Sequence, residues 1–486
     1  MAIKKLVSTL FLLLLILTLI FSFNWFNAGQ QKQDIMPAVS LFSNDESIAT
    51  TLSNLIQFRT VSNSGLPENT TQNAKLIKYL ELHFDSVFKN LTVKYFDDNA
   101  LLLTWPGKNP QLNPAMFNAH FDVVTTDESK WQYAPFSGKI DNSHVWGRGA
   151  LDDKSAITSI LHALTKLIET NYQPERTLYF AFGGDEEIGG HHGAKQISEH
   201  LASSNVELGF LLDEGMPITV DIMKGVDKPV AMIGIAEKGY ANIQLTTKTS
   251  GGHSSSPPAE TAIGILASAI SKIEARPMEK MISKPIAHLF NTLAPDMKPL
   301  QGIVVSNLWA TESLLTGQLE KHNSTNALIR TTLAPTMISG SKQANVLARQ
   351  SSAIINTRVL PGNTINQVVN HIKQTINDER IEISILGTAT EPSSVSSISS
   401  AAYKNIETAI KETFSDVLVA PSLLIASTDT KHYAPITENV YRFRPLWIKK
   451  EDIERFHGAN ERISIDNLKK MTMFYHQLIQ KSGSSE

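Results

Sequence analysis

Short apolar runs that lead into clustered acids alternate with amphipathic helices, and this pattern constrains the fold most. The apolar run at residues 178–182 leads into Gly183-Gly184-Asp185-Glu186-Glu187. Other apolar runs end shortly before His120 and directly before Asp213. Between residues 155 and 170 the apolar side chains recur at helical spacing. Such strand–helix alternation predicts an α/β domain with a mostly parallel sheet.

A second pattern interrupts the first. The expected elements are a strand over residues 240–247, a helix over 260–275, a strand over 345–360, a helix over 365–377 and a strand over 381–386. They predict a small α+β sandwich. A chain of 486 residues is long enough for more than one core. We therefore expect a catalytic domain in two parts, 45–236 and 389–486, with a domain inserted at 237–388.

The N-terminus has a charge and apolar pattern of its own. Lys4 and Lys5 precede an uncharged apolar run over residues 6–26, which is long enough to span a bilayer as a helix. This predicts a transmembrane helix over residues 1–26, followed by a polar linker over 27–44. The alternative is a cleaved signal peptide, which would make the protein secreted. The lysines place the body of the protein outside the cytoplasm, in a periplasmic, extracellular or lumenal space.

Composition excludes several classes of function. The formal net charge is −3 and no basic tail is present, so no nucleic-acid partner is expected. The chain contains no cysteine, which excludes disulfides, thiolate metal sites and a cysteine nucleophile. Any bound metal must be held by His, Asp and Glu side chains, and such ligands favour zinc or another first-row divalent ion.

Glu186 and Glu187 are difficult to explain as structural residues. Two adjacent carboxylates at the end of a buried strand repel each other, and burying either costs several kcal/mol without a compensating cation. A divalent metal ion would supply that cation. One carboxylate could bind the ion while its neighbour transfers a proton.

Other candidate ligands follow further apolar runs. Taken singly, each also fits a surface pair, a helix cap or a turn. Asp122 is placed to fix the tautomer of a metal-binding His120. Carboxyl ends of parallel strands meet at one edge of a sheet, where α/β proteins build their sites. Together the residues predict two metal ions with three ligands each and one shared aspartate; the candidates are His120, Asp152, Glu186, Glu187, Asp213, Glu214 and His457.

In this ordered combination, residues 45–480 resemble the co-catalytic zinc metallopeptidases, which include aminoacylase, carboxypeptidase S and the carnosine dipeptidases. The carboxypeptidase S branch, with the N-fatty-acyl-amino-acid synthase/hydrolase, is the most similar. The resemblance implies two Zn²⁺ ions per subunit, with Co²⁺ or Mn²⁺ as alternatives. The roles that it implies are His120 and either Asp213, the preferred candidate, or Glu214 at the first metal, Asp152 as the bridge, Glu187 and His457 at the second metal, and Glu186 as catalytic base.

The same resemblance extends to the inserted domain, which is similar to the family's lid or dimerisation domain. It implies a homodimer in which His253 reaches the partner subunit's site and stabilises an oxyanion. Arg358 would pair with a substrate carboxylate, for which a guanidinium is well suited. Asn345 would contact the substrate, although Leu347-Ala348 stands where the family has Ile-Pro.

These residues predict a zinc-dependent hydrolase that cleaves amide bonds, as a carboxypeptidase or an N-acyl-amino-acid amidohydrolase. The expected substrate is a peptide or an N-acyl amino acid with a free carboxylate. The alternatives are a non-catalytic binding or receptor module on the same fold and a metal-dependent deacetylase or esterase. A two-metal phosphatase or nuclease is less consistent with the arginine and histidine of the inserted domain.

Overall fold

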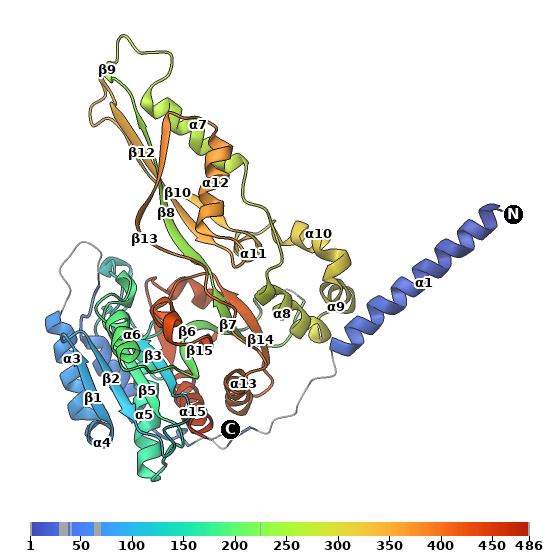
Figure 1. Cartoon of the computed structure of the whole chain (residues 1–486). Helices are drawn as coiled ribbons and strands as arrows, with labels where there is room; N and C mark the ends of the chain where they lie inside the picture. Colours follow the sequence, from blue (N-terminus) through green and yellow to red (C-terminus); the bar gives the residue numbers. More distant parts are fainter. Residues whose placement is uncertain (1, 29–36, 39–40, 63–69, 224, 485–486) are drawn as a thin grey trace.

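The computed structural model describes residues 2–28, 37–38, 41–62, 70–223 and 225–484. Figure 1 shows a large α/β domain, a slender domain that rises from it, and the helix α1 (Ala2–Ala28), which extends to one side. Segments from both ends of the chain build the α/β domain. The slender domain, formed by residues 239–275 and 332–390, is called the lid domain below.

An eight-stranded sheet forms the centre of the α/β domain. Its strands lie in the order β1 (Thr92–Phe96), β2 (Ala100–Trp105), β5 (Leu178–Gly183), β3 (Ala115–His120), β6 (Phe210–Thr219), β15 (Val440–Ile448), β7 (Val230–Glu237) and β14 (Leu418–Leu424). β3 is parallel to β5 and β6, and β15 is parallel to β6. The predicted mostly parallel sheet is confirmed. β1 and β2 form antiparallel pairs at one edge. At the other edge, β7 and β14 are parallel to each other and antiparallel to β6 and β15.

Helices cover both faces of this sheet because successive side chains of a strand point to opposite faces. Phe117 and Phe180 stack with ring centroids 5.3 Å apart and face one helical layer. Their neighbours Met116 and Ala181 face the other layer. The first layer consists of α2 (Ser47–Gln57), α3 (Thr70–His83), α4 (Asp85–Asn90), α5 (Lys154–Glu169), α13 (Ala401–Thr413) and α15 (Ile465–Ser482), and the second contains α6 (Ala194–Ser203) and α14 (Thr430–Tyr433).

The lid domain is a four-stranded antiparallel sheet with two helices packed on it, as predicted for an α+β sandwich. Its strands lie in the order β10 (Thr332–Ser339), β12 (Gln350–Val359), β8 (Gly239–Lys248) and β13 (Ile381–Thr390). The helices are α7 (Ala262–Ala275) and α12 (Ile365–Ile376). The strand expected over residues 345–360 is interrupted. Its first part, β11 (Val346–Leu347), pairs instead with β9 (Gly252–His253) at the tip of the domain.

Between α7 and β10 the chain forms helices that the sequence pattern does not reveal. These are α8 (Lys284–Leu293), α9 (Pro299–Ser306), α10 (Leu308–Leu319) and α11 (Asn323–Ile329). Ile286 and Leu289 of α8 pack against Val230 of β7 and Ala420 of β14. This helical segment therefore rests on the α/β domain, although it lies within the predicted insertion of residues 237–388. The domain boundaries themselves stay predictions.

Two consecutive buried residues join the α/β domain to the lid domain. Glu237, the last residue of β7, accepts hydrogen bonds from Thr428, Thr430 and Arg442. Lys238, the next residue, donates to the carbonyl oxygens of residues 327 and 330, both at 2.8 Å. The junction is thus bonded to the α/β domain on one side and to α11 and the residue that follows it on the other.

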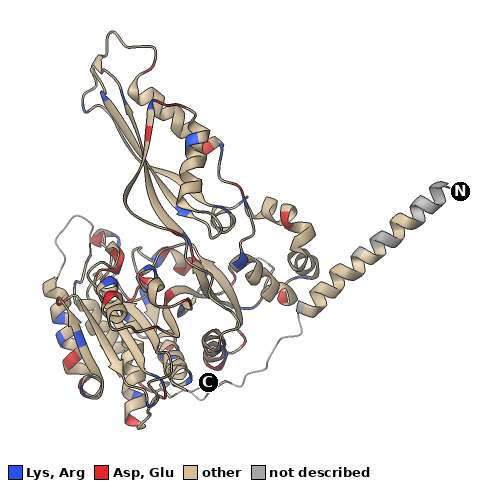
Figure 2. Cartoon of the chain, in the orientation of Figure 1, with Lys and Arg blue, Asp and Glu red and all other residues tan. Residues whose placement is uncertain are grey.

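The helix α1 contains the predicted transmembrane segment, and the part of it that is coloured in Figure 2 carries no charged residue. Its last turns contact the helical segment, where Trp25 Nε1 donates to the carbonyl oxygen of Ala294 at 2.9 Å. Asn24 donates to the side chain of Asn307 at 2.8 Å. Within the described part of the chain, no helix is long and apolar enough to cross a membrane.

Candidate metal centre

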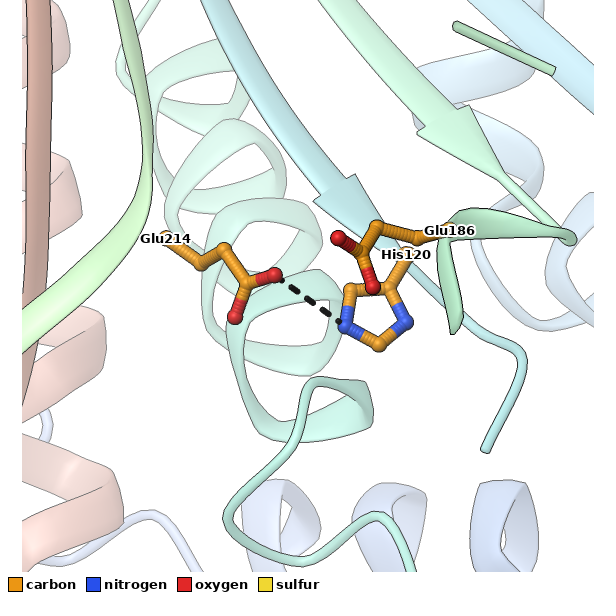
Figure 3. A group of neighbouring side chains, drawn as sticks. All are labelled: His120, Glu186 and Glu214. Atoms are coloured by element: carbon orange, nitrogen blue, oxygen red, sulfur yellow. Dashed lines mark ion pairs between the residues drawn. The ribbon is translucent and has the colours of Figure 1, made fainter. Parts of the chain in front are cut away.

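The carboxyl ends of β3, β5 and β6 bring together a histidine and several acids. His120 is the last residue of β3, Glu186 and Glu187 lie in a 3₁₀ turn after β5, and Glu214 lies in β6. Figure 3 shows His120, Glu186 and Glu214 directed toward one another. Nitrogen or oxygen atoms of these three side chains lie within 4.8 Å of one another, and so do those of His120, Asp152 and Glu187.

Asp152 offers one oxygen to each of two groups of ligands. Its Oδ1 lies 3.0 Å from His120 Nε2, and Glu214 Oε1 lies 3.6 Å from the same nitrogen. Its Oδ2 lies 3.3 Å from His457 Nε2, which is also 3.3 Å from Glu187 Oε1. This is the geometry of a carboxylate that bridges two cations. The structure thus joins Asp152 and His457, which are far apart in the sequence.

Asp122 positions both the histidine and the pair of glutamates. His120 Nδ1 donates to the main-chain oxygen of Asp122 at 3.0 Å, which directs Nε2 toward Asp152 and Glu214 as the nitrogen that could bind a metal. The Asp122 carboxylate accepts hydrogen bonds from the backbone N–H groups of Glu186 at 3.0 Å and Glu187 at 3.1 Å. Its predicted role beside His120 is therefore accompanied by a second role, because it fixes the turn that carries the two glutamates.

Asp213 and Glu214, which the sequence leaves as alternatives, occupy different positions. Asp213 is buried and accepts hydrogen bonds from Asn118 at 2.9 Å and from the backbone of Glu214 at 2.9 Å. Glu214 extends to His120. The pairing between β6 and β15 shifts just after Asp213, and this irregularity turns Glu214 toward the other ligands. The geometry therefore favours Glu214 over Asp213 as the acid beside His120.

Glu461 is a functional residue that sequence reasoning missed. It is fully buried and accepts hydrogen bonds from the backbone N–H groups of Gly149 at 3.0 Å, Leu151 at 2.7 Å and Asp152 at 3.2 Å. It also pairs with Arg148 at 2.6 Å. Glu461 thereby holds the loop of Asp152 beside the loop of His457. Its only sequence signal is an acid four residues after a candidate ligand.

Arg444 is a second residue that sequence reasoning missed. Its side chain is buried and donates to Asp152 Oδ1 at 2.8 Å. It also pairs with Glu214. No motif singles out this arginine, because its partners come from other strands and loops.

Charge and burial shift the pKa values in this centre. Burial raises the pKa of Glu186 well above its ordinary value, and Asp429 and Glu187 add to the effect. Burial also raises the pKa of Glu187. Burial alone would raise the pKa of Asp152 as well, but Arg444 and the two histidines hold it well below its usual range. Asp152 thus keeps its negative charge without a metal.

The ligand chemistry fits two divalent ions. His120, Asp152 and Glu214 could hold one ion, and Asp152, Glu187 and His457 could hold the other. All of these ligands are nitrogen or carboxylate oxygen atoms, which suit zinc and other first-row divalent ions.

The predicted residues of the lid domain do not join this group. His253 is exposed, and its backbone pairs with Val346 at the tip of the domain, next to Asn345, whose carbonyl oxygen accepts a hydrogen bond from Ser254 at 3.1 Å. In Figure 1 this tip, labelled β9, lies at the far end from the α/β domain. Arg358 lies at the opposite end of β12, with its guanidinium 4.9 Å from the ring centre of Tyr240.

A mixed sheet with such ligands at its strand ends is typical of metal-dependent hydrolases. The model of Peptidase family M20/M25/M40 matches residues 116–481. The probable carboxypeptidase S-like 2 of Dictyostelium discoideum is 36% identical over 94% of this chain and 90% of its own length. The N-fatty-acyl-amino acid synthase/hydrolase of Mus musculus is 38% identical over 92% of this chain and 90% of its own length.

The fold agrees with these matches. A crystal structure of an M20 family metallo-carboxypeptidase from Sulfolobus solfataricus covers 90% of this chain and 99% of its own, with a TM-score of 0.66 and 18% identity. The chain belongs to the M20/M25/M40 peptidase family and is a metallohydrolase. The resemblance predicted from the sequence motifs is confirmed.

Metal binding at His457 is expected to depend on pH. In the metal-free protein, hydrogen bonds to Asp152 and Glu187 raise the pKa of His457 to about 10. His457 is therefore protonated at neutral pH, and an ion must displace that proton. Burial would lower the pKa of His120, but hydrogen bonds to Asp122 and Asp152 raise it well above its ordinary value, so this ligand also loses a proton on binding. We therefore expect the apparent affinity for Zn²⁺ to increase by at least about tenfold per pH unit between about pH 6 and 8. Calorimetric titration in buffers of different ionisation enthalpy measures the released protons.

The matched control is His457→Gln, which has no imidazole proton to lose. The affinity of this variant for Zn²⁺ should increase less steeply with pH than that of the wild type, because binding releases about one proton fewer. An affinity for Zn²⁺ that does not change with pH in the wild type would contradict the prediction.

Proposed function

We propose that the chain hydrolyses the amide bond of a peptide or of an N-acyl amino acid whose free carboxylate the protein recognises, and that two zinc ions serve it. The observation that carries this proposal is the division of the two adjacent glutamates. Glu187 contacts His457 and faces Asp152, whereas Glu186 faces His120 and Glu214. The names of the Dictyostelium and mouse relatives support the substrate class.

Each side chain has a defined task in this proposal. Asp152 bridges the two positions through its two oxygens, and His120 and Glu214 complete the first. When bound, the two ions would polarise the scissile carbonyl and lower the pKa of a nearby water. Asp122 and Glu461 are positioning residues, because they fix the loops that carry the ligands.

Glu186 is the proposed general base. Its carboxylate lies beside the ligands, and its backbone is held by Asp122 at 3.0 Å. A carboxylate with a raised pKa can accept a proton from the attacking water and return it to the leaving amine. Its neighbour Glu187 is turned toward His457, so the two acids do not compete for the same task.

Replacing Glu186 with Gln should abolish turnover without removing metal. The substitution keeps the shape of the side chain but removes the proton acceptor, so we expect kcat to decrease by about 10³-fold. Two ions per chain should remain. The measurements are kcat on N-acyl amino acids and carboxypeptidase substrates, together with the metal content by mass spectrometry.

Glu187→Gln is the control for this substitution, because it should lose metal as well as activity. A near-normal rate in Glu186→Gln would show that Glu186 is not the base. A loss of metal from Glu186→Gln would instead show that Glu186 is a ligand.

The lid domain is the proposed source of substrate recognition between two subunits. His253 lies at the exposed tip, away from the ligands of its own chain, which supports a role in the site of a second copy. The buried Nη1 of Arg358 has no hydrogen-bond partner among the described residues, and this unfilled donor supports a role in holding a carboxylate. A homodimer would place the tip of one lid domain near the metal centre of the other subunit.

Mixing two inactive variants tests this arrangement. Glu186→Gln and His253→Ala should each be inactive alone if the histidine acts in the partner subunit. After the subunits are exchanged at equal amounts, random pairing should restore roughly a quarter of the wild-type activity, because half of the dimers contain one intact site. Activity is measured before and after exchange.

A mixture of Glu186→Gln with His120→Ala is the control for that exchange. Both substitutions damage residues of the same site, so no pairing of these subunits should rebuild an active one when His120 serves its own chain. If the mixture of Glu186→Gln and His253→Ala stayed inactive after exchange, a shared site would be ruled out.

We also propose that the catalytic body lies outside the cytoplasm. The positive charges of Lys4 and Lys5 before the apolar run at residues 6–26 support this orientation. Protease added to intact cells that contain the chain should degrade it while leaving a cytoplasmic marker protein intact. The mass of the purified protein shows whether the N-terminal segment is retained. Protection of the chain equal to that of the marker would contradict the proposal.

A further inference from the structure

Arg444 introduces a fixed positive charge into the metal centre. It lies in β15, beside β6, and its side chain is 3% exposed. The guanidinium donates to the carbonyl oxygen of Leu151 at 2.8 Å and to Asp152 Oδ1 at 2.8 Å. It also pairs with Glu214 and lies 3.3 Å from Asp153 Oδ1. An arginine stays protonated throughout the working pH range of proteins.

The contacts of Arg444 fall on only one of the two groups of ligands. Asp152 Oδ1, which it contacts, is the oxygen that faces His120. Glu214 directs one oxygen to His120 and the other to Arg444. The Asp152 oxygen on the side of His457 is Oδ2. Within the described residues, the hydrogen bonds and ion pairs of Arg444 include neither Glu187 nor His457.

We propose that Arg444 makes the two metal positions unequal, so that the position at His120 and Glu214 holds its ion more weakly than the position at Glu187 and His457. This inference rests on the proposed function, because it concerns the same metal centre. The reason is electrostatic. The guanidinium repels a nearby divalent ion and takes up part of the negative charge of the two acids that would bind it.

Arg444 also has a favourable effect on the same acids. Without Arg444, the buried Asp153 would lose its ion pair, and Asp152 and Glu214 would retain only their contacts with His120 and His457, which is costly. The planar guanidinium contacts the three acids at fixed angles and keeps their oxygens in place before any metal arrives. The position at His120 and Glu214 is thus preorganised, but it attracts its ion less strongly than the position at Glu187 and His457.

The order of metal binding tests the proposal in the full chain. Protein stripped with a chelator is titrated with Zn²⁺ in competition with a chromophoric chelator. We expect two steps whose dissociation constants differ by at least about tenfold. Glu214→Gln should weaken or remove the weaker step, and Glu187→Gln the tighter one. Two equal affinities, or the opposite assignment of the steps, would overturn the proposal.

Variants of the arginine separate its charge from its packing. Arg444→Gln should reduce the ratio of the two dissociation constants by about tenfold. Arg444→Lys should keep most of that ratio, because the positive charge remains. Arg442→Gln is the matched control, since Arg442 is also buried in β15 but pairs with Glu237 at 3.0 Å. It should leave the difference unchanged. Circular dichroism confirms that each variant is folded.

The remaining outcomes are also decisive. An unchanged difference in folded Arg444→Gln, or an equal loss of the difference in Arg444→Lys, would refute the role of the charge. If Arg444→Gln does not fold, the comparison of Glu214→Gln with Glu187→Gln still shows which of the two positions binds Zn²⁺ more weakly. A chain that hydrolyses substrate with two equally bound ions would refute this inference alone. A chain that binds no Zn²⁺ and hydrolyses nothing would refute the proposed function.

Discussion

Buried negative charge at the carboxyl ends of β3, β5 and β6 is the constraint on which the rest of the structure depends. Carboxylates gathered in a place of low polarity repel one another, and each costs several kcal/mol unless a cation compensates it. Arg444 and His457 provide part of the compensating positive charge, and they contact different oxygens of Asp152. The remaining charge is what attracts metal ions. Fold stability and metal affinity therefore depend on the same residues.

Much of the centre could be predicted from the sequence, because the residues involved follow apolar runs directly. His120 and Glu186 stand at or just after strand ends, and parallel strands bring their carboxyl ends to one edge of the sheet. The α/β architecture and the inserted antiparallel sheet followed from alternation in the same way. His457 required the family resemblance, since nothing in its own surroundings marks a ligand.

The rest depended on contacts between distant segments, which no local pattern contains. The choice between Asp213 and Glu214 depends on an irregular pairing with β15, more than 200 residues later. Glu461 acts by accepting hydrogen bonds from backbone groups around residue 150, and backbone groups leave no trace in a sequence. The helices between α7 and β10 were missed because their apolar faces are short and rest on another domain.

The junction at Glu237 and Lys238 has a mechanical consequence. At the point where β7 passes into β8, Glu237 is bonded to the α/β domain and Lys238 to the helical segment, so the base of the lid domain is held by contacts outside that domain. Because the lid domain is long, a slight rotation at the junction would displace the tip of the domain by a much larger distance. A substitution at Lys238 would therefore move His253 relative to any neighbouring subunit while leaving the sequence of the tip unchanged.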